Sequence, residues 1–96
     1  MLIRKRIKVG KKYIQAILFH LGNRNLIVLK GSKGYVMCGY LNLKAAEKFK
    51  DVAIKITGVS TIAQARKALV SSCTPSAKKL KIYKGQPVKE VLKIIV

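Results

Sequence analysis

Hydrophobic and polar residues alternate at the start of the chain, as expected for a half-buried β-strand. Within residues 3–9, one face is apolar and the other is basic: Ile3, Ile7 and Val9 against Arg4, Arg6 and Lys8. Residues 13–21, 26–30 and 35–41 form three further apolar segments. Short turns rich in Gly and Asn separate them, so we predict an antiparallel β-meander.

The middle segments are apolar without alternation. Residues 16–19 read Ala-Ile-Leu-Phe and residues 26–29 read Leu-Ile-Val-Leu, which places apolar side chains on both faces of the sheet. An antiparallel sheet with one solvated face would have polar residues at every second position. The helices that follow can cover only one face. A second copy of the chain is therefore the expected cover for the other.

The second half of the chain predicts helices around one further strand. Asn42 is a candidate cap for a helix over 43–50, and residues 52–57 alternate as a strand does. Thr61 and Gln64 form a capping box that begins a helix reaching about residue 70. Thr74 and Pro75 start a short helix to residue 80. A last helix follows Pro87, with Val88, Val91, Leu92 and Ile95 facing inward.

This order of elements predicts an α+β fold with a mostly antiparallel sheet. The chain has 96 residues, so we expect one small domain with a single core. Its two parts are a β-rich region over residues 1–41, which we expect to mediate oligomerisation, and a mixed α/β region over 42–96.

The charge adds a second hypothesis about partners. Lys and Arg number 21 against 3 Asp and Glu, a net charge of +18. Such an excess favours a polyanion such as nucleic acid, because like charges repel one another in the compact state. The basic residues are spread evenly and only four are Arg, the residue best suited to reading bases. Polyanion binding and simple solvation by lysine both remain open.

Two cysteines, Cys38 and Cys73, are too few for a disulfide framework. Free thiols and a cytoplasmic location are the expectation. The apolar residues 14–21 follow a basic segment, as in a signal peptide, but Gln15 and His20 interrupt them. They are also too few to cross a bilayer, so no membrane association is expected.

The sequence lacks most of the residue patterns that form catalytic or metal-binding sites. One histidine, two distant cysteines and three carboxylates offer no chelating spacing, so neither a metal nor a cofactor is predicted. Glu47 and Asp51 are four residues apart among lysines, which indicates surface ion pairs. Residues 31–34 indicate a hairpin turn rather than a phosphate loop. Residues 58–61 join a strand to a helix N-terminus, where free backbone N–H groups favour an anion, although an ordinary strand-to-helix connection is the preferred interpretation.

Cys38 and His20 are the nearest approach to a nucleophile and its base. Pairing Leu21 with Leu26 and Lys30 with Tyr35 places the two residues in one row, two strands apart. That separation is about 9.6 Å, which is too long for direct proton transfer. An inert, buried Cys38 is the alternative to a cysteine-dependent enzyme.

The run Gly34-Tyr-Val-Met-Cys-Gly39 resembles the YunC-like family of small bacterial and archaeal proteins, a domain of unknown function. Tyr40-Leu-Asn-Leu43, Gly58-Val-Ser-Thr-Ile62 and the segment from Lys84 to Ile95 are similar to later parts of the family pattern. The resemblance implies an α+β fold whose N-terminal β-region forms a homotetramer. It implies no activity, cofactor or substrate.

Cys38 is therefore the centre of the predicted site. It is the candidate catalytic residue if the protein is an enzyme. The candidate ligand-binding residues are Tyr35, Met37, Cys38, Gly39, Gly58 and Thr61. Three functions remain open: a homo-oligomeric protein of unknown activity with either a structural role or a small-ligand site near Cys38, which is preferred, a polyanion-binding module, and, least favoured, a cysteine-dependent enzyme.

Overall fold

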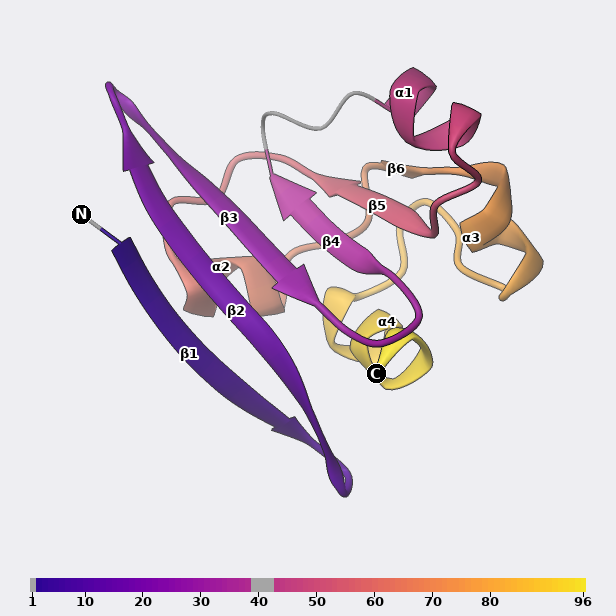
Figure 1. Cartoon of the computed structure of the whole chain (residues 1–96), viewed down its shortest axis with the longest axis horizontal. Coiled ribbons are helices and arrows are strands. Elements are labelled where there is room, and N and C mark those ends of the chain that lie inside the picture. The colour runs from indigo at the N-terminus through magenta and orange to yellow at the C-terminus, as the bar shows by residue number, and fades with distance from the viewer. Residues whose placement is uncertain (1, 39–42) are drawn as a thin grey trace.

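One six-stranded sheet runs through the molecule, and its strand order follows the chain from β1 to β6 (Figure 1). The computed structural model describes residues 2–38 and 43–96. The first four strands, β1 (Leu2–Val9), β2 (Lys12–Leu21), β3 (Arg24–Lys30) and β4 (Tyr35–Cys38), pair antiparallel with their neighbours. The predicted meander is therefore confirmed.

The second half adds two strands and four helices. α1 (Leu43–Lys48) leads to β5 (Ala53–Ile56), which pairs parallel with β4. α2 (Ile62–Lys67) leads to β6 (Ser72–Cys73), which pairs antiparallel with β5. α3 (Pro75–Lys79) and α4 (Val88–Ile95) complete the chain. This is an α+β fold with a mostly antiparallel sheet, as predicted.

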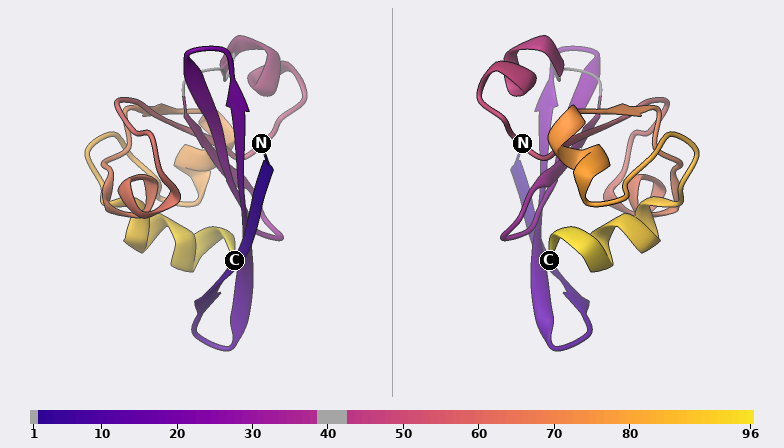
Figure 2. Two further views of the ribbon diagram at one scale, coloured as in Figure 1. Left: turned by 90° about the vertical axis from the view of Figure 1, so that its left-hand side faces the viewer. Right: turned by 90° about the vertical axis from the view of Figure 1, so that its right-hand side faces the viewer.

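The two faces of the sheet have different cover. α2 and α4 lie on one side, which we call the covered face, and α1 lies on the other side (Figure 2). The inward residues of α4 pack there against strand residues such as Ile14, Leu29 and Val36, which are fully buried. Over β1–β4 the other side is apolar but open, and we call it the open face: Leu2, Tyr13, Ile17, Phe19, Leu26, Val28 and Met37.

The predicted helix starts are confirmed. The Thr61 hydroxyl accepts a hydrogen bond from the Gln64 amide at 3.0 Å, and the Thr74 hydroxyl accepts one from the Ala77 amide at 3.3 Å. Pro75 occupies the first turn of α3, where its missing N–H has no cost. The helix predicted from Thr61 to residue 70 ends earlier, at Lys67. Ala68 is already extended, and Leu69 forms a β-bridge with Pro87.

Two details of the sheet differ from the prediction. The β2–β3 turn contains only Gly22 and Asn23, and Gly22 has a φ of +51°, as a tight hairpin requires. Leu21 therefore pairs with Arg24 rather than Leu26, a register shift of two residues. β6 was not predicted, because a two-residue strand has no periodicity to detect. The predicted Asn42 cap and strand residues 39–41 lie outside the described residues.

The β3–β4 turn holds the end of α4. The Lys33 amide donates to the Ile95 carbonyl at 2.9 Å, and the Ser32 hydroxyl donates to the Val96 carbonyl at 2.7 Å. Gly31 lies so close that a Cβ there would overlap the Ile95 carbonyl. This turn therefore satisfies carbonyl groups that the helix end leaves without a partner.

Candidate functional site

The candidate site lies at the edge of the sheet where β2, β4 and β5 end. These three strands run in the same direction, because β2 and β4 are both antiparallel to β3 and β5 is parallel to β4. A hollow of about 540 Å³ opens there, which we call the Cys38 hollow. Its lining comes from three strands and two loops: His20, Asn23, Arg24, Asn25, Cys38, Gly58, Val59 and Ser60.

Asn25 organises one wall of the Cys38 hollow. Its amide nitrogen donates to the Ser60 carbonyl at 2.8 Å, which ties the sheet to the loop before α2. Its amide oxygen lies 2.6 Å from Nδ1 of His20. Because an amide oxygen only accepts hydrogen bonds, Nδ1 must carry the proton. In the neutral imidazole, Nε2 of His20 is therefore left as an acceptor.

Cys38 lies beside the same asparagine. Its thiol donates to the Asn25 carbonyl at 3.5 Å, and the residue is only 3% exposed. The thiol is therefore already engaged by a backbone carbonyl, and almost none of the side chain reaches solvent. Asn25 therefore contacts both His20 and Cys38. It links these two residues in one hollow without a direct bond between them.

The structure brings together some of the predicted site residues. Cys38 and Gly58 line the Cys38 hollow, and Thr61 lies next to it with its hydroxyl occupied by the α2 cap. Tyr35 and Met37 lie on the opposite side of the sheet, on the open face. Gly39 lies outside the described residues.

The sequence prediction did not identify Asn25, Arg24 or Ser60. Residues 22–25 were interpreted as one long turn, which removed both Arg24 and Asn25 from the sheet. A Gly-Asn pair is a recognised signal for a two-residue turn, and it places His20 directly opposite Asn25. The contact between Asn25 and Ser60 spans 35 residues and has no signal in the sequence.

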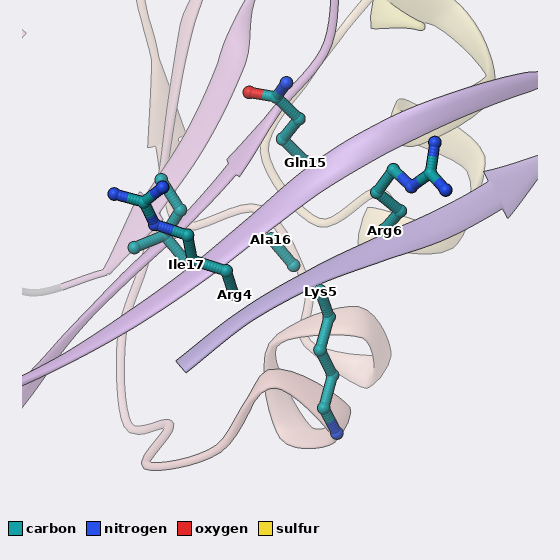
Figure 3. A pocket seen from close by; sticks show the side chains of 6 residues that line it. All are labelled: Arg4, Lys5, Arg6, Gln15, Ala16 and Ile17. Atoms are coloured by element: carbon teal, nitrogen blue, oxygen red, sulfur yellow. The ribbon is translucent and has the colours of Figure 1, made fainter. Parts of the chain in front are cut away.

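The open face carries basic and aromatic side chains beside its apolar centre. A second hollow, of about 500 Å³, lies along β1 and β2, with Arg4, Arg6 and Ile17 in its lining. Figure 3 shows Lys5 directed to the other side of the sheet from Arg4 and Arg6. The guanidinium of Arg6 lies 5.0 Å from the ring centre of Tyr13, a cation–π contact.

Two titratable groups have shifted pKa values. Burial raises the pKa of Tyr35, and its hydrogen bond to Asp51, at 3.1 Å, raises it further. Burial also raises the pKa of the Cys73 thiol, which donates to the Ile82 carbonyl at 3.4 Å, while nearby Lys78 lowers it. Neither group lines the Cys38 hollow.

The described residues contain no group of three or more side chains placed to hold a metal ion. Among the helices the structure describes, none has the length and apolar character needed to cross a membrane.

Comparison with known proteins gives the family. A domain of unknown function, DUF1805, matches residues 37–95. The chain belongs to the DUF1805 family. The chain is also similar to a crystal structure of the protein of unknown function TA1206 from Thermoplasma acidophilum, with a TM-score of 0.96 and 35% identity over 100% of this chain and 94% of that one. A search of the curated proteins finds no match.

Only part of the lining of the Cys38 hollow lies within the residues that match the family. The DUF1805 residues include Cys38 and the loop from Gly58 to Ser60, whereas His20 and Asn25 precede them. The comparisons assign no activity to the family or to TA1206. The narrower YunC-like assignment remains a prediction.

Proposed function

We propose that this DUF1805 protein binds a small anionic ligand in the Cys38 hollow. The observation that carries the proposal is the position of Asn25, whose side chain bonds to both His20 and the Ser60 carbonyl. These bonds hold the imidazole and the loop before α2 in one arrangement before any ligand arrives. A site that is already ordered loses less conformational entropy on binding.

The chemistry of the lining favours an anion that also offers a hydrogen-bond donor. Arg24 contributes to the lining at the rim of the hollow, where β3 begins, and an arginine guanidinium binds carboxylate or phosphate oxygens in a planar fork. Nε2 of His20 accepts a hydrogen bond in its neutral form. The volume of about 540 Å³ is within the range typical of small-molecule sites.

The histidine makes this proposal directly testable, because the chain contains only one. NMR signals of the His20 imidazole are followed while a panel of small hydroxycarboxylates, amino acids and inorganic phosphate is added. We expect a saturable shift for at least one compound. Arg24→Gln should weaken that binding about tenfold, as expected for a lost charged hydrogen bond.

Lys79→Gln is the control, because Lys79 is an exposed cation in α3 and lies outside the Cys38 hollow. It should leave the ligand-induced shift of the His20 signals unchanged. A panel that moves no His20 signal, or equal losses in Arg24→Gln and Lys79→Gln, would show that the hollow is not a ligand site.

Self-association through the open face is a second candidate property, and a specific observation favours it. Leu2 and Phe19 are 45% and 40% exposed, and they border the half-buried apolar residues Ile17, Leu26 and Val28. A contiguous apolar surface of this kind on a soluble protein marks an interaction site. A second copy, and a tetramer at full assembly, is the occupant that we propose.

Light scattering on a sizing column tests this assembly. We expect a mass above that of one chain, and Phe19→Ser should lower it. Leu69→Ser is the matched control, since Leu69 is 57% exposed and follows α2, which lies on the opposite side of the sheet from the open face. A wild-type mass of one chain at micromolar concentration would reject the assembly.

Nucleic-acid binding, a cytoplasmic location and a cysteine-dependent reaction have less support than the two properties above. Nucleic-acid binding rests on the net charge of +18 alone. A reducing, cytoplasmic environment is inferred from the free cysteines Cys38 and Cys73. A cysteine-dependent reaction would need an accessible Cys38, and this side chain is 3% exposed with its thiol donating to the Asn25 carbonyl.

A further inference from the structure

The side of the molecule away from the open face carries a groove that the proposed function does not use. It lies between β1, α2 and α4 and consists of two adjoining hollows of about 370 and 220 Å³. We call it the α2–α4 groove and define it by its apolar floor, Ile7, Val9, Leu92 and Val96, and by two cations, Arg66 and Lys89. These two cations line both hollows.

A backbone contact sets the relative position of the two helices. The Val88 amide, at the start of α4, donates to the Ala68 carbonyl, just after α2, at 2.9 Å. Arg66 and Lys89 are within two residues of this bond, one on each helix. The fold therefore holds Arg66 and Lys89 at one groove, whose lining also includes Lys8, Lys67 and Lys93.

Neither cation is neutralised by the protein. Lys93 in the same lining is paired with Glu90, at 3.4 Å, and neither Arg66 nor Lys89 has such a carboxylate partner among the described residues. Two uncompensated like charges lining the same groove raise the free energy of the folded protein. An anion placed between Arg66 and Lys89 would remove that cost.

The floor of the groove is apolar. Ile7 and Leu92 are 7% and 2% exposed, and Val9 and Val96 are half-buried at its border. The cations alone would not select a ligand, since lysines are common on this chain, and neither would the apolar floor alone. Their combination favours a ligand that is apolar at one end and anionic at the other.

We infer that the α2–α4 groove binds a small amphipathic anion, with its acidic head between Arg66 and Lys89 and its hydrocarbon part on the apolar floor. The volume of the larger hollow is in the range of small-molecule sites, which favours a free, medium-chain molecule over a peptide or a bilayer. The site is distinct from the Cys38 hollow and does not depend on the function proposed for it.

Calorimetry with octyl phosphate, kept below its micellar concentration, tests the inference on the intact protein. We expect binding of one molecule per chain. Each methylene that leaves water adds about a fourfold gain in affinity, so four buried methylenes predict about 200-fold tighter binding than for inorganic phosphate. Octanol, which has the chain without the charge, should bind weakly. Octanoate in place of octyl phosphate shows whether the head is a phosphate or a carboxylate.

Variants locate the site. Arg66→Gln and Lys89→Gln should each weaken octyl phosphate binding about tenfold, while Arg66→Lys should retain most of it. Both positions are exposed on the surface of their helices, and circular dichroism checks that the variants fold. The matched control is Lys79→Gln, because Lys79 is an exposed lysine at the end of α3 and outside the groove.

Several results would overturn the inference. Equal losses in Lys79→Gln and Lys89→Gln would show diffuse attraction to a basic surface. Inorganic phosphate binding as tightly as octyl phosphate, with both lost in Arg66→Gln, would remove the role of the apolar floor. Binding to anionic vesicles without binding to monomeric octyl phosphate would indicate a membrane surface instead, and no binding at all would reject the site.

Discussion

Replacing Gly31 with alanine should detach the end of α4 from the sheet. The added methyl group would overlap the Ile95 carbonyl and lie 2.9 Å from a methyl of Ile14, both of them buried. The φ of Gly31 is not in the left-handed region, so alanine has no backbone cost there. The whole effect therefore comes from the overlap with α4.

The magnitude follows from the contacts that the methyl group displaces. Overpacking a core position costs about 1–3 kcal/mol. If α4 shifts, the hydrogen bonds from Lys33 and Ser32 to its last carbonyls are lost, at about 1 kcal/mol each. The sum is about 3–5 kcal/mol, a large part of the roughly 5–14 kcal/mol expected for a domain of this length.

Thermal and urea unfolding followed by circular dichroism measure this loss. We expect Tm to fall by at least about 12 °C, at roughly 4–8 °C per kcal/mol. Gly10→Ala is the control, because Gly10 has a φ of +64° and nothing within 4 Å of an added Cβ. It isolates the backbone cost, about 1 kcal/mol. A smaller loss for Gly31→Ala than for Gly10→Ala would refute the docking of α4 on this turn.

Three further predictions concern single side chains. Thr74→Val should lower the free energy of unfolding in urea by about 2–4 kcal/mol. The buried Thr74 hydroxyl donates to the Asp51 carbonyl at 2.6 Å and accepts from two amides, and valine removes all three bonds. Thr74→Ser, which keeps the hydroxyl, should retain most of that stability. The raised pKa of Tyr35 means that the folded state retains this proton more strongly than the unfolded state, so stability should fall as pH rises above about 10. Tyr35→Phe should reduce that alkaline loss, and equal pH profiles for both proteins would contradict the assignment. Cys38 should react with a thiol reagent at neutral pH more slowly than Cys73, which is more exposed, and the reverse order would revive a cysteine-dependent reaction.

Much of the fold was accessible from the sequence because its signals are local. Alternation in residues 3–9 and the spacing of Val88, Val91, Leu92 and Ile95 state directly which face of each element is buried. The caps at Thr61 and Thr74 depend on residues three positions apart. These predictions require no knowledge of distant segments.

The candidate site was less accessible because it depends on distant contacts. Cys38 and Gly58 were among the predicted residues and both line the hollow, but a two-residue error in the β2–β3 turn removed Asn25 from the sheet. The predicted face of each strand residue was still correct, because side chains alternate with a period of two and a shift of two residues keeps each one on its face. The error did change which residue of β3 lies opposite His20. That residue is Asn25, and the hydrogen bonds of the Cys38 hollow depend on it.

The sequential order of the strands has a consequence for how the chain folds. Each antiparallel pair from β1 to β4 joins neighbours in the sequence, so the meander forms through small loop closures, which are fast. The bond from Ser32 to Val96 instead joins positions 64 residues apart. Contacts of this range form late, so changes at the Gly31 turn should accelerate unfolding more than they slow folding. We therefore expect φ-values to be high in the N-terminal hairpins and low where α4 docks, which would make that docking the main control on the unfolding rate.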